Sequence, residues 1–225
     1  NTAFGGETLA GSSTVEELET QWVAPPGPRY QADRQSRRPA PLATAGRLFL
    51  QGNDRLMALN SFNGQLQWSW ELPGLNRFNM PRDCSNWCAD DDAVYVAIGD
   101  SCWQLDAATG VQNQRLQVSV DKDWGYVARA DDLLLGSEVK PGQTFTDWWG
   151  GTYWYDAREG SATEKVCSDS LFAHDLTQNK LRWKYQNGLI LNTTITIADQ
   201  RIYFLENRSA DLMEQTARRF AGTGL

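Results

Sequence analysis

The segment RLFLQGNDRLMALNSFNGQLQW, residues 47–68, carries a pattern that returns at least twice further along the chain. Two short apolar runs, 47–50 and 55–59, flank the turn residues Gly52, Asn53 and Asp54, a pattern typical of a β-hairpin. The Asn63-Gly64 pair predicts a tight primed turn, because such turns need residues with positive φ. Residues 65–70 then alternate, with Leu66, Trp68 and Trp70 on one side. The segment therefore predicts an antiparallel meander without a helix.

Parts of this meander recur along the chain. An apolar pair that opens the second strand appears as Leu48-Phe49, Val94-Tyr95, Leu133-Leu134 and Ile202-Tyr203. A polar residue and a turn follow in three copies, and a Trp lies four residues past the turn position at Trp68 and Trp183, where the second copy has Gln114. Repeats of about 40 to 45 residues, each a four-stranded antiparallel meander, are typical of β-propeller blades. The recurring Trp is expected to dock one blade on the next.

The predicted fold is therefore an all-β propeller of four-stranded antiparallel blades. Three blades are expected at 40–72, 85–120 and 124–187, the last with an insertion at 140–166, followed by a partial blade at 193–206. A closed ring takes about four to eight blades, so this ring is incomplete. We favour a fragment of a longer propeller over a second chain that supplies the remainder. The first residue is Asn1 and not Met, which fits a processed chain or a piece of a longer one.

The two ends differ in composition from the repeats. Residues 1–39 are expected to hold one outer strand at Glu19–Ala24 and a crossing rich in proline and arginine, while residues 207–225 form a tail with the pattern of a helix. A plain antiparallel sandwich would also space its turns regularly. It gives no reason for the repeated turn followed by Trp, so we favour the propeller.

Composition excludes some classes of function. The chain has 225 residues, 41% of them hydrophobic, with 10 Trp and a formal net charge of -7, and its only basic cluster is short. This argues against a nucleic-acid groove, which needs clustered Lys and Arg. No apolar run approaches the length of a membrane span, and no signal peptide is visible.

Three segments resemble a known repeat. LDAATG (105–110), ALNSFNGQLQW (58–68) and AHDLTQNKLRW (173–183) are similar to the A-x-D-x-x-T-G-x-x-x-W repeat of the pyrroloquinoline quinone (PQQ)-like β-propeller superfamily. The strings GRLFLQGNDRLMALNSFNG, NMPRDCSNWCADDDAVYVA and CSDSLFAHDL resemble a branch abundant in planctomycetes and related bacteria. The resemblance covers about residues 18 to 206 and implies a bacterial protein of the periplasm, the cell envelope or the secreted fraction.

The resemblance implies two functions, because the superfamily includes quinoprotein dehydrogenases and non-enzymatic scaffolds. We expect a non-enzymatic binding or assembly scaffold without a cofactor, within a larger exported protein. Its partner would be another protein or the remaining blades of the same propeller. The alternative is a PQQ- and calcium-dependent quinoprotein oxidoreductase, although the vicinal Cys-Cys pair of the PQQ-dependent alcohol dehydrogenases is absent from this sequence.

Candidate binding residues gather on one predicted face of the propeller. Loops from second to third strands and loops between blades emerge on a common face, and loops on a rigid scaffold are where binding usually resides. A self-packed insertion that caps the channel is the alternative role for the aromatic residues of 140–166. The candidates are Asn79, Arg82, Asp83, Asn86, Asp123, Trp124, Trp148, Trp149, Trp154 and Asn192.

The cysteines and acidic residues give weaker signals. Cys84, Cys88, Cys102 and Cys167 are expected near the same face, as disulfides in an exported protein or as free buried thiols, and their spacing does not fit a zinc site. Oxygen atoms of Asn79, Asp83 and Asn192 are candidate cation ligands. We interpret residues 90–92, three consecutive aspartates, as a hairpin turn and the single histidine, His174, as structural. With His174 as the single histidine, the sequence does not support a Ser/His/Asp or Cys/His catalytic arrangement.

Overall fold

The computed structural model describes residues 20, 22–23, 39–52, 54–75, 86–139 and 167–209. Its first two sheets are four-stranded and antiparallel, with the strands in chain order. The first holds β1 (Leu42–Thr44), β2 (Arg47–Gly52), β3 (Arg55–Asn60) and β4 (Leu66–Glu71). The second holds β5 (Trp87–Ala89), β6 (Ala93–Ile98), β7 (Ser101–Asp106) and β8 (Gln112–Gln117). We call these sheets blades 1 and 2.

Blade 3 has the same architecture around the predicted insertion. Its order is β9 (Asp123–Ala130), β10 (Leu133–Val139), β12 (Ser170–Asp175) and β13 (Lys180–Tyr185). A hairpin of β15 (Thr196–Ala198) and β16 (Arg201–Tyr203) follows. The predicted all-β fold of four-stranded antiparallel blades in an incomplete ring is confirmed.

The chain adds a small sheet that the sequence did not predict. β11 (Cys167–Ser168) pairs with β14 (Leu189–Leu191), which also pairs with β17 (Glu206–Asn207). A short 3-10 helix, Asn192–Thr194, leads from β14 to the hairpin. These segments are too short to show a strand period, which is why alternation alone did not reveal them.

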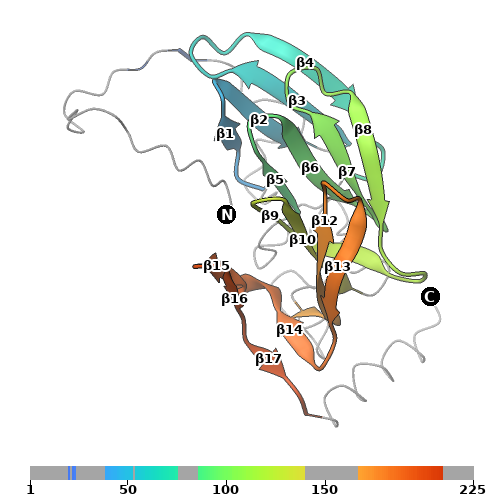
Figure 1. Ribbon diagram of the computed structural model, residues 1–225. Coiled ribbons are helices and arrows are strands. Elements are labelled where there is room, and N and C mark those ends of the chain that lie inside the picture. The colour runs from blue at the N-terminus through green and yellow to red at the C-terminus, as the bar shows by residue number, and fades with distance from the viewer. Residues whose placement is uncertain are drawn as a thin grey trace, which may run out of the picture.

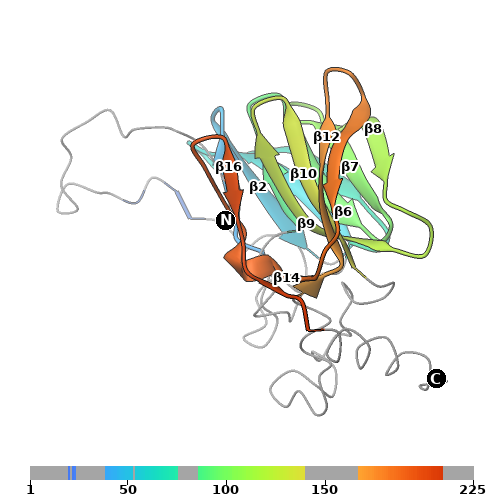
Figure 2. The same ribbon diagram turned by 60° about the horizontal axis from the view of Figure 1, so that its bottom comes forward.

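The blades lie side by side with equivalent strands aligned (Figure 1). The inner strands β1, β5 and β9 contact one another in sequence, and β4, β8 and β13 form the outer edges. The turns β1–β2 and β3–β4 of blade 1 and their equivalents lie at one end, which we call the hairpin face. The opposite end, the loop face, carries the strand 2 to strand 3 loops and the links between blades. In Figure 2 the β12–β13 turn lies at the upper end and β14 at the lower end.

The turn between β3 and β4 differs from its prediction. Residues 61–65 separate β3 from β4, and only Gly64 has positive φ, at 70°. Asn60 Oδ1 accepts hydrogen bonds from the backbone N–H groups of Phe62 and Asn63, at 2.9 and 3.3 Å. These bonds favour a right-handed turn and leave one left-handed position. The two-residue primed turn was therefore wrong, and Asp106 makes the same bonds ahead of Gly110 in blade 2.

The docking role predicted for the recurring Trp is confirmed at Trp68. Its Nε1 donates to the carbonyl of Ala107 in blade 2 at 3.0 Å, and its ring is 7% exposed. The ring lies so close to Gly110 that a Cβ there would stand 2.7 Å from Cε3 of the indole. Trp22 repeats this arrangement on blade 1, because its Nε1 donates to Ser61 at 2.9 Å and its ring covers Gly64. A Trp over a turn glycine is thus the docking unit.

Several predictions fall wholly or largely on residues that the structure does not describe. They include the strand at Glu19–Ala24, of which residues 20, 22 and 23 are described and are not in a strand, most of the tail 207–225, and the insertion 140–166. Within the described ranges, no helix is long and apolar enough to cross a membrane.

Candidate functional site on the loop face

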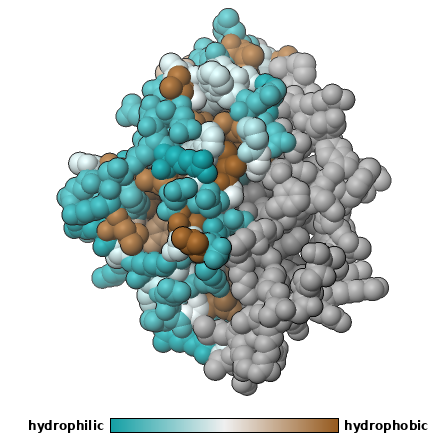
Figure 3. All heavy atoms as spheres, turned by 90° about the vertical axis from the view of Figure 1, so that its right-hand side faces the viewer, coloured by the Kyte–Doolittle hydropathy of each residue, from teal (hydrophilic) through white to brown (hydrophobic). Residues whose placement is uncertain are grey.

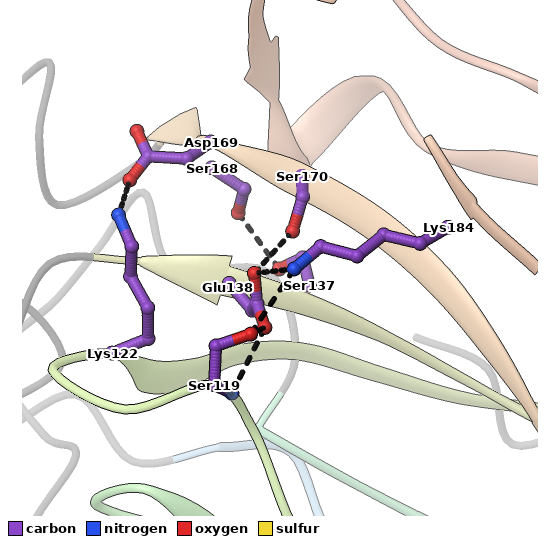
Figure 4. Close-up of polar contacts among 8 residues, drawn as sticks. All are labelled: Ser119, Lys122, Ser137, Glu138, Ser168, Asp169, Ser170 and Lys184. Atoms are coloured by element: carbon purple, nitrogen blue, oxygen red, sulfur yellow. Dashed lines mark hydrogen bonds and ion pairs between the residues drawn. The ribbon is translucent and has the colours of Figure 1, made fainter. Parts of the chain in front are cut away.

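Glu138 is the centre of a polar cluster where blade 3 meets the loop face (Figure 4). It lies near the end of β10 and is only 4% exposed. Its Oε2 accepts from Lys184 Nζ at 2.5 Å and from Ser170 Oγ at 2.8 Å. Its Oε1 accepts from the backbone N–H and the hydroxyl of Ser119, at 3.0 and 2.6 Å. A buried carboxylate is thereby supplied with four donors from three segments of the chain.

These donors decide the ionisation of Glu138. Burial by itself would raise the pKa, but hydrogen bonds from Lys184, Ser119 and Ser170 outweigh burial and lower the pKa from 4.5 to about 2. The carboxylate is therefore charged at neutral pH. A base with such a low pKa is poorly matched to proton abstraction near pH 7, so its chemistry is structural.

A second chain of hydroxyl groups lies beside the first. Ser168 Oγ lies 2.7 Å from Ser137 Oγ and 2.5 Å from Asn192 Oδ1, and Ser137 Oγ also accepts from the backbone N–H of Tyr126 at 2.7 Å. Gly125 makes room for the cluster, because a Cβ there would stand 2.5 Å from Ser137 Oγ. All three polar side chains are buried.

Together the two clusters join both ends of the insertion. Ser137 and Glu138 precede residues 140–166, whereas Ser168 and Ser170 follow them, and the register pairs Glu138 with Ser170 across β10 and β12. Lys122, on the link from blade 2, forms an ion pair with Asp169 (Figure 4). Buried polar contacts therefore join the residues on either side of the segment that carries the predicted aromatic candidates.

The sequence candidates divide into three groups. Asn86, Trp124 and Asn192 are 1%, 1% and 3% exposed, so they contribute to the interior beneath the face. Asp123 is partly exposed at the start of β9. The candidates outside the described residues are Asn79, Arg82, Asp83, Trp148, Trp149 and Trp154, and their role stays a prediction.

The buried candidates connect neighbouring blades. Asn86 Nδ2 donates to Gln51 Oε1 at 3.0 Å, which joins blade 2 to the end of β2. Trp124 Nε1 donates to the carbonyl of Tyr126 at 2.9 Å, and its ring meets Phe172 edge-on with centroids 5.0 Å apart. The backbone N–H of Trp124 also donates to Gly99 of blade 2. These contacts position the loop face.

The cysteines Cys88, Cys102 and Cys167 are free thiols in this structure, and Cys84 lies outside the described residues. Burial raises the pKa of the Cys167 thiol to about 11, and it raises the pKa of Cys88 and Cys102 well above the ordinary value. Thiols held protonated in this way are poor nucleophiles.

The residues interpreted as structural make local contacts. Asp90 Oδ1 accepts from the backbone N–H groups of Asp92 and Ala93, and its Oδ2 lies 3.1 Å from Arg129 Nε. His174 lies on β12, with Nε2 3.1 Å from Asn179 Oδ1. Both positions serve turns of the hairpin face.

A calcium ion and a quinone are what the resemblance implies for an enzyme of this superfamily. Asn192 is the one described member of the proposed cation ligands, and its side-chain oxygen accepts from Ser168 inside the protein. Within the described ranges no group of three His, Cys, Asp or Glu side chains could hold a metal ion. The other two proposed ligands, Asn79 and Asp83, lie outside the described residues, so the calcium site stays a prediction of the enzymatic alternative.

Comparison with known proteins finds neither a matching family model nor a matching curated protein. Solved structures with a similar chain trace include BamB from Moraxella catarrhalis, at 14% identity and a TM-score of 0.43, covering 75% of this chain and 44% of that one. Quinohemoprotein alcohol dehydrogenase from Comamonas testosteroni is 14% identical, with a TM-score of 0.44, and the match covers 82% of this chain and 24% of that one. The WD40 domain of Neurospora crassa Pan2 is 9% identical, with a TM-score of 0.47, and the match covers 82% of this chain and 47% of that one. The chain spans less than half the length of each.

Proposed function

We propose that this chain is part of a non-enzymatic PQQ-like propeller that acts as a binding or assembly scaffold for a protein partner in the bacterial envelope. The observation that carries the proposal is the Glu138 cluster, which joins both ends of the insertion and the link from blade 2 to blade 3. Binding loops gain affinity when their supporting residues are fixed before the partner arrives. The larger exported protein that we expect would supply the remaining blades.

The ionisable groups of this face support a scaffold over a catalyst. Glu138 is buried and charged with a pKa of about 2, and the Cys88 and Cys102 thiols are buried and held protonated. Perturbed groups of this kind occur in structural networks as well as in active sites. Here each partner of Glu138 belongs to a segment that the cluster fixes in place.

Two exposed apolar residues allow a site-specific test. Val120, on the link between β8 and β9, is 89% exposed on the loop face, and Phe62, on the β3–β4 turn, is 69% exposed on the hairpin face. A photo-crosslinking amino acid at position 120 should give a discrete protein adduct in cells, while the same group at position 62 should give none. Equal adducts from both positions would contradict a loop-face partner.

The enzymatic alternative has its own readout. The absorption spectrum of the purified full-length protein should stay unchanged after PQQ and Ca²⁺ are added and unbound quinone is removed. A stoichiometric quinone chromophore that survives gel filtration would overturn the non-enzymatic assignment.

A further inference from the structure

The interface between blades 2 and 3 lacks the docking Trp. Register places Gln114 at the docking position, because Gln114 faces Gln104 as Trp68 faces Ala58 in blade 1 and Trp183 faces Ala173 in blade 3. The outer strand β8 therefore carries no indole to lay on the β12–β13 turn.

The receiving turn has changed as well. Asn179, with φ 50°, stands where blades 1 and 2 have Gly64 and Gly110, with φ 70° and 72°. A Cβ at either glycine would stand 2.7 Å from the docked indole, so the Cβ of Asn179 is incompatible with an indole in that pose. Gln114 Nε2 instead donates to Asn179 Oδ1. The two replacements thus belong together, and no indole of the described residues is docked between blades 2 and 3 at this position.

A groove of about 490 Å³ lies beside this contact, between β8 and the strands β12 and β13, and we call it the interblade groove. Its floor is apolar and buried, formed by Leu116, Trp124 and Phe172. Figure 3 faces the side of the molecule that carries β8 and β13, and it shows apolar surface set among hydrophilic side chains. The volume lies in the range of small-ligand sites, about 300 to 1,000 Å³.

The groove is basic on an otherwise acidic chain. Its lining holds Arg115, Lys180 and Lys184 against one carboxylate, Glu138, while the chain as a whole has a formal net charge of -7. Asp100 pairs with Arg115 at 3.2 Å and Glu138 with Lys184 at 2.5 Å. Lys180 forms no ion pair with a described residue, so its charge can attract an anion. Charge complementarity of this kind selects partners and speeds their encounter.

We propose that the interblade groove binds an aromatic side chain presented by an acidic segment of a protein partner. The aromatic ring lies over the apolar floor of Leu116, Trp124 and Phe172, displaced from the docking pose that the Cβ of Asn179 excludes. The proposal does not depend on a partner at the loop face.

The test uses capped tripeptides and the full chain. Acetylated, amidated Glu-Trp-Glu is titrated to millimolar concentration and followed by two-dimensional NMR and calorimetry. Shift changes should be saturable and confined to the groove lining on β8, β12 and β13 and to the floor residue Trp124. Glu-Ala-Glu and Lys-Trp-Lys should each bind at least about fivefold more weakly, because one lacks the ring and the other has the opposite charge.

Variants separate the groove from the rest of the surface. The double variant Gln114→Trp with Asn179→Gly rebuilds the docking unit and should abolish binding of Glu-Trp-Glu while it raises Tm. Lys180→Glu should weaken binding about fivefold. Arg201→Glu is the matched control, because Arg201 is exposed on β16 and absent from the groove lining, and it should leave binding unchanged.

Three results would overturn the proposal. The first is no saturable binding of Glu-Trp-Glu to the wild-type chain, and the second is equal binding to the double variant. The third is a wild-type dimer in sedimentation that the double variant abolishes, since a second copy would then occupy the groove. Because Lys180→Glu changes an exposed side chain, it keeps the charge argument testable even if the double variant does not fold.

Discussion

The two interfaces of blade 2 use equivalent positions of the repeat but differ in the residues found there. Between blades 1 and 2, Trp68 lies over Gly110, donates to Ala107 and belongs to a core that spans both blades. Between blades 2 and 3, Gln114 faces Asn179, and a groove with an apolar floor remains. Where the docking Trp and the turn glycine are present, the two blades pack closely, and where both are replaced, a groove lies between the blades.

A second device compensates for the missing indole. Blade 3 is held to blade 2 by the buried core of Trp124 and Phe172 and by the Glu138 cluster, to which the link residue Ser119 contributes two hydrogen bonds. The contacts that hold this interface together therefore lie in the core and near the loop face. We therefore expect a different residue to make the largest contribution to stability at each interface.

Truncation of Trp68 should have the largest effect. Trp68→Ala removes a buried indole and its bond to Ala107, so we expect a loss of about 4 kcal/mol in the free energy of unfolding. The control is Trp70→Ala, because Trp70 is 47% exposed and its bond to Thr109 measures 3.1 Å; a loss of about 1 kcal/mol is expected. Urea denaturation measures both, and equal losses would contradict the docking role of Trp68.

Removal of the Glu138 charge should come next. Glu138→Gln leaves Lys184 without its carboxylate and should cost about 3 kcal/mol at neutral pH. Because the folded pKa is lowered from 4.5 to about 2, this stabilisation is complete above pH 4.5 and is lost as the pH falls through about 2. Urea unfolding from pH 7 to pH 2 should show the two curves converge, and a difference that persists at pH 2 would refute the assignment.

The glycine beneath the indoles should give a smaller effect. Gly110→Ala at φ 72° adds a Cβ 2.5 Å from Trp70, so steric overlap adds to backbone strain and we expect a loss of about 2 kcal/mol. Gly99→Ala is the control, because Gly99 also has positive φ, at 55°, but a Cβ there would lie in open space. It should cost about 1 kcal/mol from strain alone. Thermal unfolding of both variants checks the difference.

Local patterns predicted much of this fold, for physical reasons that particular residues show. The alternation at Leu66, Trp68 and Trp70 follows one edge strand, and the turn before it is bounded by polar residues, so β4 was visible in the sequence. The turn type was wrong because the side chain of Asn60, and not the Asn63-Gly64 pair alone, decides the backbone there.

The candidate site was harder to predict from the sequence, because its residues come together only in the folded chain. Ser119, Glu138, Ser170 and Lys184 come from four separate segments, and the available signal was an ionisable residue in the otherwise buried strand Leu133–Val139. Gln114 was recognised as a departure from the repeat. Its pairing with Asn179 depends on the contact between two blades, which one sequence does not reveal.

The most direct test of the docking unit is a double-mutant cycle at positions 114 and 179, measured by urea unfolding at neutral pH. Gln114→Trp alone should destabilise the chain, because its indole meets the Cβ of Asn179, whereas Gln114→Trp with Asn179→Gly should exceed the wild type. We expect a favourable coupling of about 2 kcal/mol between the two changes. Additive changes, within about 0.5 kcal/mol, would contradict a docking unit made of a Trp over a turn glycine.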